Sequence, residues 1–323
     1  MTRWGLTIPL GGLPLPDHRD VIRALPSFGY TDVWSAETNG CDAFTPLALA
    51  SAWEPTLRLG TAIVPVFTRG PALIAMSAAA MAAAAPGRFV LGLGASSPVI
   101  VGNWNGLEFD DPYRRCRDVL RAVRTALAGE RVDGVFDTFT IKRFKLEQAP
   151  EIAPPVLLAA LRPQMLRLAG LEADGAILNW LSPNDVPVCV ASIDEPDADV
   201  VARIFVCPTA DAAYARNLGK LLISTYLTVP AYAAFHDWLG RGKALRPMHE
   251  AWAAGDRAGA AAAIPDDVVD ELVVHGTPEA CRAQVRAYAA AGVKTPVLAV
   301  LPTPEMTDAA TLLDILRRLG PGA

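Results

Sequence analysis

The residues best suited to chemistry lie where two strand-like runs end. The first run starts at Arg58 and reaches Gly60, Thr61 and Ala62, and the second ends in residues 92–97, Gly-Leu-Gly-Ala-Ser-Ser. Small residues let a ligand approach the backbone closely, and backbone N–H groups with two nearby hydroxyls are suited to bind phosphate. An ordinary tight turn would use the same residues, so their spacing leaves both interpretations open.

The glycine run is not a dinucleotide-binding fingerprint. That motif needs three glycines and a helix that opens directly after them. Here Ser97 stands at the third glycine position, residues 98–106 predict a loop, and the next helix is expected to begin near Tyr113. The run is better explained as a strand end that leaves its backbone accessible.

The elements that position these residues alternate regularly along the chain. Apolar runs predict strands at 4–9, 32–36, 57–64, 89–94, 155–160, 175–180, 200–207 and 296–301. Helical patterns fall at 18–28, 42–53, 71–84, 113–128, 163–172, 211–238, 278–291 and 308–319. This α/β alternation predicts a (β/α)8 TIM barrel that residues 1–323 form as a single domain. Ligands of such barrels bind at the C-terminal ends of the strands.

Two segments do not fit the regular alternation of strands and helices. Residues 130–150 alternate like a β-hairpin, which predicts a hairpin insertion after helix 4. Residues 211–275 are too long for one crossover and predict a helical insertion between strands 7 and 8. The crossover near 182–190 has room for only a short helix. We expect the two insertions to supply the walls of the substrate pocket.

Composition argues against several classes of partner. The formal net charge of −5 offers no electrostatic basis for binding nucleic acid or an anionic membrane. The five cysteines and four histidines are scattered without metal-ligand spacing, so no metal site is expected. No secretory signal pattern is visible, and the Ala-rich run at 72–85 is too short to span a bilayer. A cytoplasmic location is expected.

Several motifs resemble those of the bacterial luciferase-like family. They are LGTAIVPV at 59–66, PGRFVLGLGASSPVIV at 86–101, WNG at 104–106, and the stretches 159–170 and 173–180. Within the family they are most similar to the coenzyme F420-dependent oxidoreductases, over about residues 4–302. The resemblance implies a (β/α)8 barrel with a deazaflavin or flavin ring at the strand ends. It also implies a homodimer that pairs through outer helices such as the apolar one at 71–84.

The resemblance further implies which residues bind the cofactor. Many members have a non-proline cis peptide in strand 3, which by motif position joins Ala62 to Ile63 here. Phosphate-binding elements follow strands 4 and 5, and their residues in this chain are Gly92, Gly94, Ala95, Ser96 and Ser97, then Ala160, Arg162 and Gln164. Related sequences commonly have glycine in place of Arg162, whose planar guanidinium either binds the anion directly or points outward.

Two cofactors are compatible with this family. Flavin-dependent members often have an arginine where this chain has Ala95, and its absence favours coenzyme F420 over FMN. The resemblance then implies an oxidoreductase that transfers a hydride between the deazaflavin and a small organic substrate. The alternatives are an FMN-dependent luciferase-like monooxygenase and a barrel that binds its cofactor without catalysis.

Glu37 is the candidate catalytic residue, because it lies at the end of the second strand within reach of a bound ring. A carboxylic acid there can protonate the substrate after hydride delivery. The other interpretation is a carboxylate that complements the dipole of the following helix. The candidate pocket residues are Trp34, Trp104, Asn105, Asn179 and Trp180. For the three tryptophans, packing within the barrel explains the sequence equally well.

Overall fold

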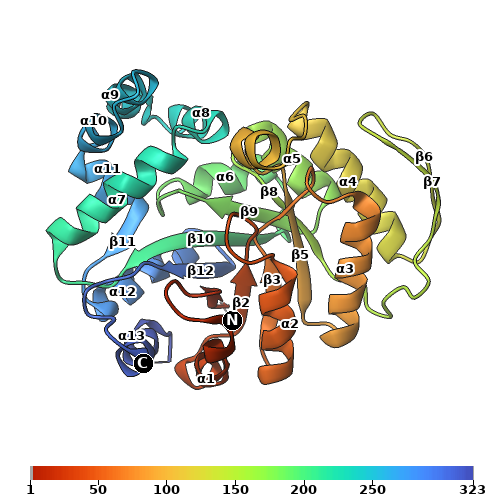
Figure 1. Ribbon diagram of the computed structural model, residues 1–323, viewed down its shortest axis with the longest axis horizontal. Helices are drawn as coiled ribbons and strands as arrows, with labels where there is room; N and C mark the ends of the chain where they lie inside the picture. Colours follow the sequence, from red (N-terminus) through yellow and green to blue (C-terminus); the bar gives the residue numbers. More distant parts are fainter. Residues whose placement is uncertain (1–2, 323) are drawn as a thin grey trace.

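Parallel strands form a closed barrel in this computed structural model, which describes residues 3–322 (Figure 1). The barrel strands are β1 (Gly5–Thr7), β2 (Asp32–Ser35), β3 (Arg58–Thr61), β5 (Phe89–Gly94), β8 (Val156–Ala159), β9 (Gly175–Asn179), β10 (Asp199–Cys207) and β12 (Thr295–Val300). Each strand pairs with the next in this order, and β12 pairs with β1 to close the ring. The predicted (β/α)8 fold is therefore confirmed.

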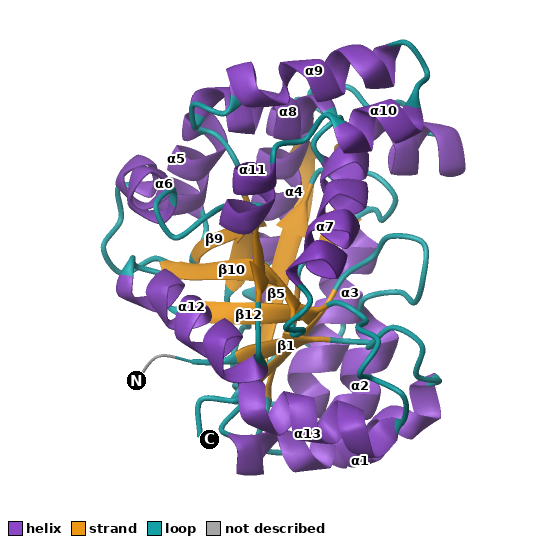
Figure 2. Cartoon of the chain, turned by 90° about the vertical axis from the view of Figure 1, so that its left-hand side faces the viewer, coloured by secondary structure: helices purple, strands orange, loops and turns teal. Residues whose placement is uncertain are grey.

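Helices surround the strands, as Figures 1 and 2 show. The helices outside the insertions are α1 (His18–Ala24), α2 (Phe44–Trp53), α3 (Pro71–Ala84), α4 (Pro112–Leu127), α5 (Pro163–Glu172), α6 (Val186–Ile193), α12 (Pro278–Ala290) and α13 (Ala309–Leu319). Proline opens α3, α4, α5 and α12, since the N–H that it lacks has no partner in a first helical turn. Within the described residues, no helix is long and apolar enough to cross a membrane.

Large apolar side chains fill the interior of the barrel. The interior cluster consists of Trp34, Val90, Leu157, Ile177, Val201 and Val297. Three partly buried residues at the strand ends, Ala62, Ile63 and Ala159, pack on this cluster. At the C-terminal mouth of the barrel, these three residues therefore form a floor over the interior cluster.

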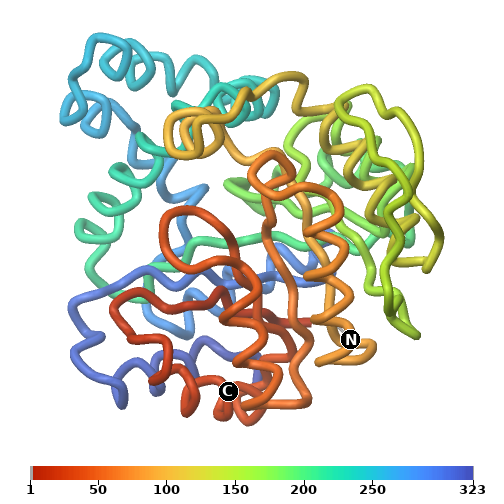
Figure 3. The backbone as a smooth tube through the Cα atoms, turned by 45° about the vertical axis from the view of Figure 1, so that its right-hand side comes forward, coloured from red at the N-terminus to blue at the C-terminus, as the bar shows by residue number. Residues whose placement is uncertain are grey.

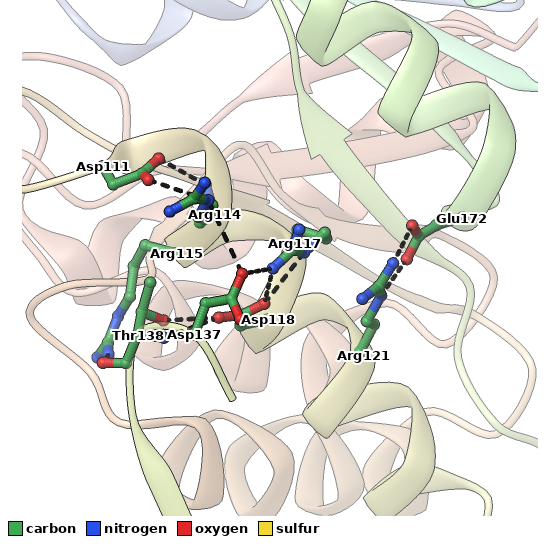
Figure 4. A network of polar contacts seen from close by, with 9 residues as sticks. All are labelled: Asp111, Arg114, Arg115, Arg117, Asp118, Arg121, Asp137, Thr138 and Glu172. Carbon is green, nitrogen blue, oxygen red and sulfur yellow. Dashed lines mark hydrogen bonds and ion pairs between the residues drawn. The ribbon is translucent and has the colours of Figure 1, made fainter. Parts of the chain in front are cut away.

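The predicted hairpin insertion is present after α4. Its strands β6 (Val132–Val135) and β7 (Thr140–Phe144) pair antiparallel. The hairpin is fixed to α4 by the buried Asp118, which accepts hydrogen bonds from the Thr138 backbone N–H and hydroxyl, each at 3.0 Å (Figure 4). Arg117 joins the other Asp118 oxygen to Asp137, at 2.8 and 2.7 Å. The hairpin therefore has a fixed position against the barrel.

The segment between β10 and β12 forms the predicted helical insertion. It contains α7 (Ala212–Tyr226), α8 (Pro230–Trp238), α9 (Gly242–Ala253), α10 (Arg257–Ala262), α11 (Asp266–Leu272) and the short strand β11 (Val273–His275). The single helix predicted at 211–238 is divided into α7 and α8, because Pro230 lacks the N–H needed to continue a helix. Figure 3 shows this insertion, in blue-green, on the opposite side of the molecule from the yellow-green hairpin.

Two further local predictions need correction. The strand predicted at 57–64 divides into β3 and β4 (Val64–Pro65), on either side of the Ala62–Ile63 peptide. The loop predicted at 98–106 contains a short π-helix, Val99–Trp104. This helix begins with the Val101 N–H donating to the Ser97 carbonyl at 2.9 Å. Both changes fall at the C-terminal mouth, where the ligand site was expected.

Candidate active site

Small residues from three adjacent strands form the floor of the mouth. The Ala62–Ile63 peptide is cis, as the family resemblance implied. A Cβ atom added to Gly94 would lie 3.0 Å from the Ala159 Cβ and 3.0 Å from the Ile63 Cγ1. The ends of β3, β5 and β8 therefore approach closely only because Gly94 has no side chain. The result is a tightly packed surface at the ends of these three strands.

Gly92 has a different role from Gly94. Its N–H donates to the Thr61 Oγ1 at 2.7 Å, and the Thr61 hydroxyl donates to the Gly92 carbonyl at 3.0 Å. A Cβ on Gly92 would lie 1.9 Å from the Thr61 carbonyl oxygen. Both backbone polar groups of Gly92 are thus engaged inside the barrel, so the structure places it as a packing residue rather than as a phosphate contact.

The turn that follows β5 contains the next three predicted cofactor residues. Ala95, Ser96 and Ser97 are all half-buried, and Ser96 has a φ of 69°. The Ser97 Oγ accepts a hydrogen bond from the Ile100 N–H at 3.3 Å, at the start of the π-helix. Ser97 therefore caps this helix, and Ser96 occupies the turn between it and the floor.

The second predicted phosphate element lies beside the first, because β8 pairs with β5. Ala160 is buried, and its N–H donates to the Ile177 carbonyl at 3.1 Å. Arg162 and Gln164 are exposed at the start of α5, where Arg162 is the N-cap residue without a side-chain cap. The structure thus brings the 94–97 turn and the start of α5 to one side of the mouth.

A cavity of about 190 Å³ opens at the ends of β2, β4 and β5. It is lined by Glu37, Thr38, Gly40, Cys41, Asp42, Pro65, Thr68, Ile100 and Asn105. The Asn105 side chain donates to the Ile100 carbonyl at 2.7 Å and so closes the end of the π-helix. The cavity brings together two residues that the sequence indicated separately, Glu37 and Asn105.

Glu37 is paired with Arg69, which the sequence analysis missed. The Arg69 Nε donates to both carboxylate oxygens at 2.9 and 3.1 Å, and Nη2 donates to Oε1 at 2.6 Å. The Ala43 N–H also donates to Oε1, at 3.2 Å. In this arrangement Glu37 only accepts hydrogen bonds, so the predicted role as a proton donor requires it to leave Arg69. The sequence signal that could have indicated this pair is the position of Arg69 in the loop between a barrel strand and the following helix.

The three candidate tryptophans lie in different environments. Trp34 belongs to the interior cluster, and a Cβ on Gly60 would lie 2.3 Å from its ring. Trp180 is buried and stacks on Phe205 with ring centroids 4.1 Å apart. Trp104, by contrast, is 54% exposed. The packing interpretation therefore explains Trp34 and Trp180, and only Trp104 is accessible from solvent.

Asn179 lies at the end of β9 and contacts the helical insertion. Its Nδ2 donates to the Tyr232 hydroxyl of α8 at 2.9 Å, while its Oδ1 is buried without a partner. Next to it on β10, Arg203 has a buried Nε that also lacks a partner. Sequence reasoning missed Arg203, although a single arginine interrupts the apolar run 200–207. This side of the mouth is polar, unlike the floor.

His236 of α8 is fully buried, and neither ring nitrogen has a hydrogen-bond partner. Burial, assisted by the charge of Arg241, lowers the pKa of His236 to about 4. The imidazole is therefore neutral in the folded protein at pH 7. In the unfolded chain, where the pKa is ordinary, it binds a proton once the pH falls below about 6.5.

This difference in pKa predicts a loss of stability in acid. As the pH falls, the imidazole takes up a proton in the unfolded chain before it does so in the folded protein. The contribution of neutral His236 to the free energy of unfolding is therefore complete above pH 6.5, and roughly 3 kcal/mol is lost as the pH falls toward 4. His236→Leu is expected to remove this part of the pH dependence. Urea unfolding of both proteins at several pH values between 7 and 4 measures it. Parallel curves for the two proteins would contradict the prediction.

The sequence between residues 3 and 295 matches the model of the luciferase-like monooxygenase family. The chain belongs to this family. A Mycobacterium tuberculosis protein named as a candidate coenzyme F420-dependent oxidoreductase is 28% identical, and the alignment covers 94% of this chain and 96% of that protein. A 5,10-methylenetetrahydromethanopterin reductase of Methanolobus tindarius is 26% identical, with coverages of 82% and 84%.

A solved structure has the same fold along its whole length. It is an F420-dependent secondary alcohol dehydrogenase in complex with an F420–acetone adduct, with a TM-score of 0.77 and 15% identity, over 99% of this chain and 98% of that one. At this identity the likeness concerns the fold alone. Together with the sequence relatives, it confirms the resemblance to luciferase-like proteins and to members named for coenzyme F420.

Proposed function

We propose that this luciferase-like protein is a coenzyme F420-dependent oxidoreductase that transfers a hydride between the deazaflavin and a small organic substrate. The observation that carries this proposal is the closely packed floor of Ala62, Ile63, Gly94 and Ala159 at the barrel mouth. It is supported by the near full-length similarity to a protein named for F420. Ala95, in place of the arginine common in flavin-dependent members, favours F420 over FMN.

The residues present fit a bound deazaflavin. A side chain on Gly94 would press against Ile63 and Ala159, so its absence lets the ends of β3, β5 and β8 pack closely beneath a bound ring. The Ser96 turn and the start of α5 lie on one side of this floor, where a phosphate can be anchored. When bound, the cofactor supplies the hydride chemistry, and the protein orients the partners and excludes water.

Glu37 is the group that we assign to proton transfer. It lies in the cavity at the mouth and is held by Arg69 through both carboxylate oxygens. Release from Arg69 would free a carboxylate oxygen of Glu37, which could then take up a proton and pass it to the substrate. Asn105 lines the same cavity and would limit how the substrate enters it.

We also propose that the chain acts as a homodimer of single-domain subunits. Leu73 and Met76 of α3 are 45% and 48% exposed, which gives this outer helix an apolar surface. Such a surface is suited to pairing with a second copy.

Side-by-side titration of the purified protein with F420 and with FMN tests the proposed cofactor. We expect clearly tighter binding of F420, and we expect Gly94→Ala to weaken that binding because the new Cβ displaces Ile63 at the floor. Equal affinity for both cofactors, or FMN that copurifies at full occupancy, would instead favour the FMN-dependent monooxygenase. Tight F420 binding without turnover of any substrate would favour the non-catalytic barrel.

A further inference from the structure

Three half-buried polar side chains gather on the side of the mouth that faces the helical insertion. Asn179 of β9 and Arg203 of β10 are directly paired across the two strands, and Asn179 contacts Tyr232 of α8. Val201, two residues before Arg203 on the same strand, belongs to the interior cluster. Because side chains alternate along a strand, Arg203 also points into the barrel, one layer nearer the mouth.

The guanidinium of Arg203 lacks an anionic partner. Its Nε is buried without a hydrogen bond, and within residues 3–322 no carboxylate lies in ion-pair distance of it. Two other poorly exposed arginines do have such partners, since Arg58 pairs with Asp199 and Arg241 pairs with Asp185. Leaving the buried Nε–H without a hydrogen-bond acceptor is costly, and a bound anion would offset this penalty.

The surroundings of Arg203 fix its orientation. Its Cζ lies 4.7 Å from the centroid of the Phe205 ring, and that ring in turn stacks on Trp180. Cation–π contact of this kind orients the planar guanidinium while its donor edge stays free for a ligand. The nearby Asn179 Oδ1, also without a partner, is free to accept a hydrogen bond from a donor on the same ligand.

Arg203 lies across the barrel from Ala62 and Ile63. In the closed ring of eight strands, β10 is four strands away from β3, so the two are opposite each other. A ring resting on Ala62 and Ile63 would therefore have Arg203 on the far side of the mouth. A substrate between the two would present one end to the ring and the other to the guanidinium.

We infer that Arg203, with Asn179 and Tyr232 beside it, binds a carboxylate of the substrate, so that the substrates are organic acids. The inference rests on the proposed function, because it places the acid opposite the cofactor. A guanidinium edge with two parallel N–H groups matches the two oxygens of a carboxylate. The cofactor's own acidic tail presents the same chemistry, and the experiment separates the two sources.

Calorimetric titration with benzoate and with benzamide, in the presence and absence of saturating F420, tests this site. The two probes have nearly the same shape and differ in charge. We expect benzoate to bind and benzamide to bind far more weakly. Arg203→Gln is expected to weaken benzoate binding by about tenfold to a hundredfold, the loss typical of a hydrogen bond to a charged group, and to leave F420 affinity unchanged.

Asn179→Asp supplies a second variant that does not remove a buried group. It places a carboxylate beside Arg203, so the two side chains should pair internally and exclude benzoate while the melting temperature is kept. Arg203→Lys should retain part of the binding, since it keeps the charge and loses the planar edge. Loss of benzoate binding in Asn179→Asp therefore supports the site even if Arg203→Gln folds poorly.

Four results decide the inference. Equal binding of benzoate and benzamide, or an Arg203→Gln variant with unchanged benzoate affinity, would overturn it. Arg203→Gln that weakens F420 as much as benzoate would also overturn it, because the anion would then belong to the cofactor tail. Benzoate binding that depends on Arg203 in a protein without affinity for F420 would support the carboxylate site and reject only the proposed cofactor.

Discussion

Gly92→Ala is expected to leave little or no folded protein. The new Cβ would lie 1.9 Å from the Thr61 carbonyl oxygen and 2.4 Å from the Ile177 Cδ1, inside the closed barrel. The first of these atoms belongs to the backbone of the neighbouring strand and is unable to move away without separating β3 from β5. We expect a loss above about 4 kcal/mol, which is exceptional for a single substitution. The yield of folded protein and its melting temperature measure it.

Gly94→Ala is the matched control for this prediction. At Gly94 the added Cβ meets only side-chain atoms of Ile63 and Ala159, at 3.0 Å or more. The Ile63 side chain can shift and the end of β8 needs to move with the Ala159 Cβ by only a few tenths of an ångström, so the barrel should fold while its floor is altered. If Gly92→Ala melted close to the wild-type temperature, the packing role of Gly92 would be refuted.

The comparison of the two glycines shows what the sequence could indicate. Both stand in one Gly-x-Gly run, and their spacing correctly predicted a strand end at the barrel mouth. Their different neighbours depend on Thr61 of the adjacent strand and on Ala159 of the next one, which only the tertiary structure brings close. Local sequence therefore located the site but did not distinguish the glycine that packs from the glycine that frees the floor.

The fold was predictable because its signals are local and repeated. Apolar runs bounded by glycine and proline predicted every barrel strand. The hairpin insertion followed from its alternating pattern and the helical insertion from its length. The errors occurred where local pattern and backbone geometry diverge. Pro230 broke a helix that the apolar pattern continued, and the π-helix at 99–104 formed where the composition indicated a loop.

The charged residues of the site were harder to predict, because their partners are distant in sequence. Glu37 was identified from its place at a strand end, yet its partner Arg69 is 32 residues away. The distinguishing feature of Arg203 is that its buried Nε has no partner, and the absence of a contact cannot be recognised in a sequence. Only the strand register, which sets Arg203 beside Asn179, shows that the two form one polar surface.

Glu37→Gln is expected to lower kcat by about 10² to 10⁴, the usual contribution of a positioned acid, with F420 affinity nearly intact. The amide keeps the shape of the side chain but is unable to take up a proton and pass it to the substrate. Oxidation of reduced F420, followed by absorbance with the substrate that the wild-type protein turns over fastest, measures the rate. The melting temperature should fall slightly, because an amide cannot accept all of the hydrogen bonds that Arg69 donates.

Arg69→Gln is the control that distinguishes proton transfer by Glu37 from a purely structural role of the Glu37–Arg69 ion pair. Both variants remove the same ion pair, so a structural effect of that pair should appear in both. Only Glu37→Gln removes the carboxyl group, and a protein that retains Glu37 without its guanidinium should keep most of its turnover. Equal losses of kcat in the two variants would mean that the pair shapes the cavity, and the proton would then have to come from another donor or from water. A rate loss confined to Glu37→Gln identifies the carboxyl group as the donor and Arg69 as the residue that holds it until substrate arrives.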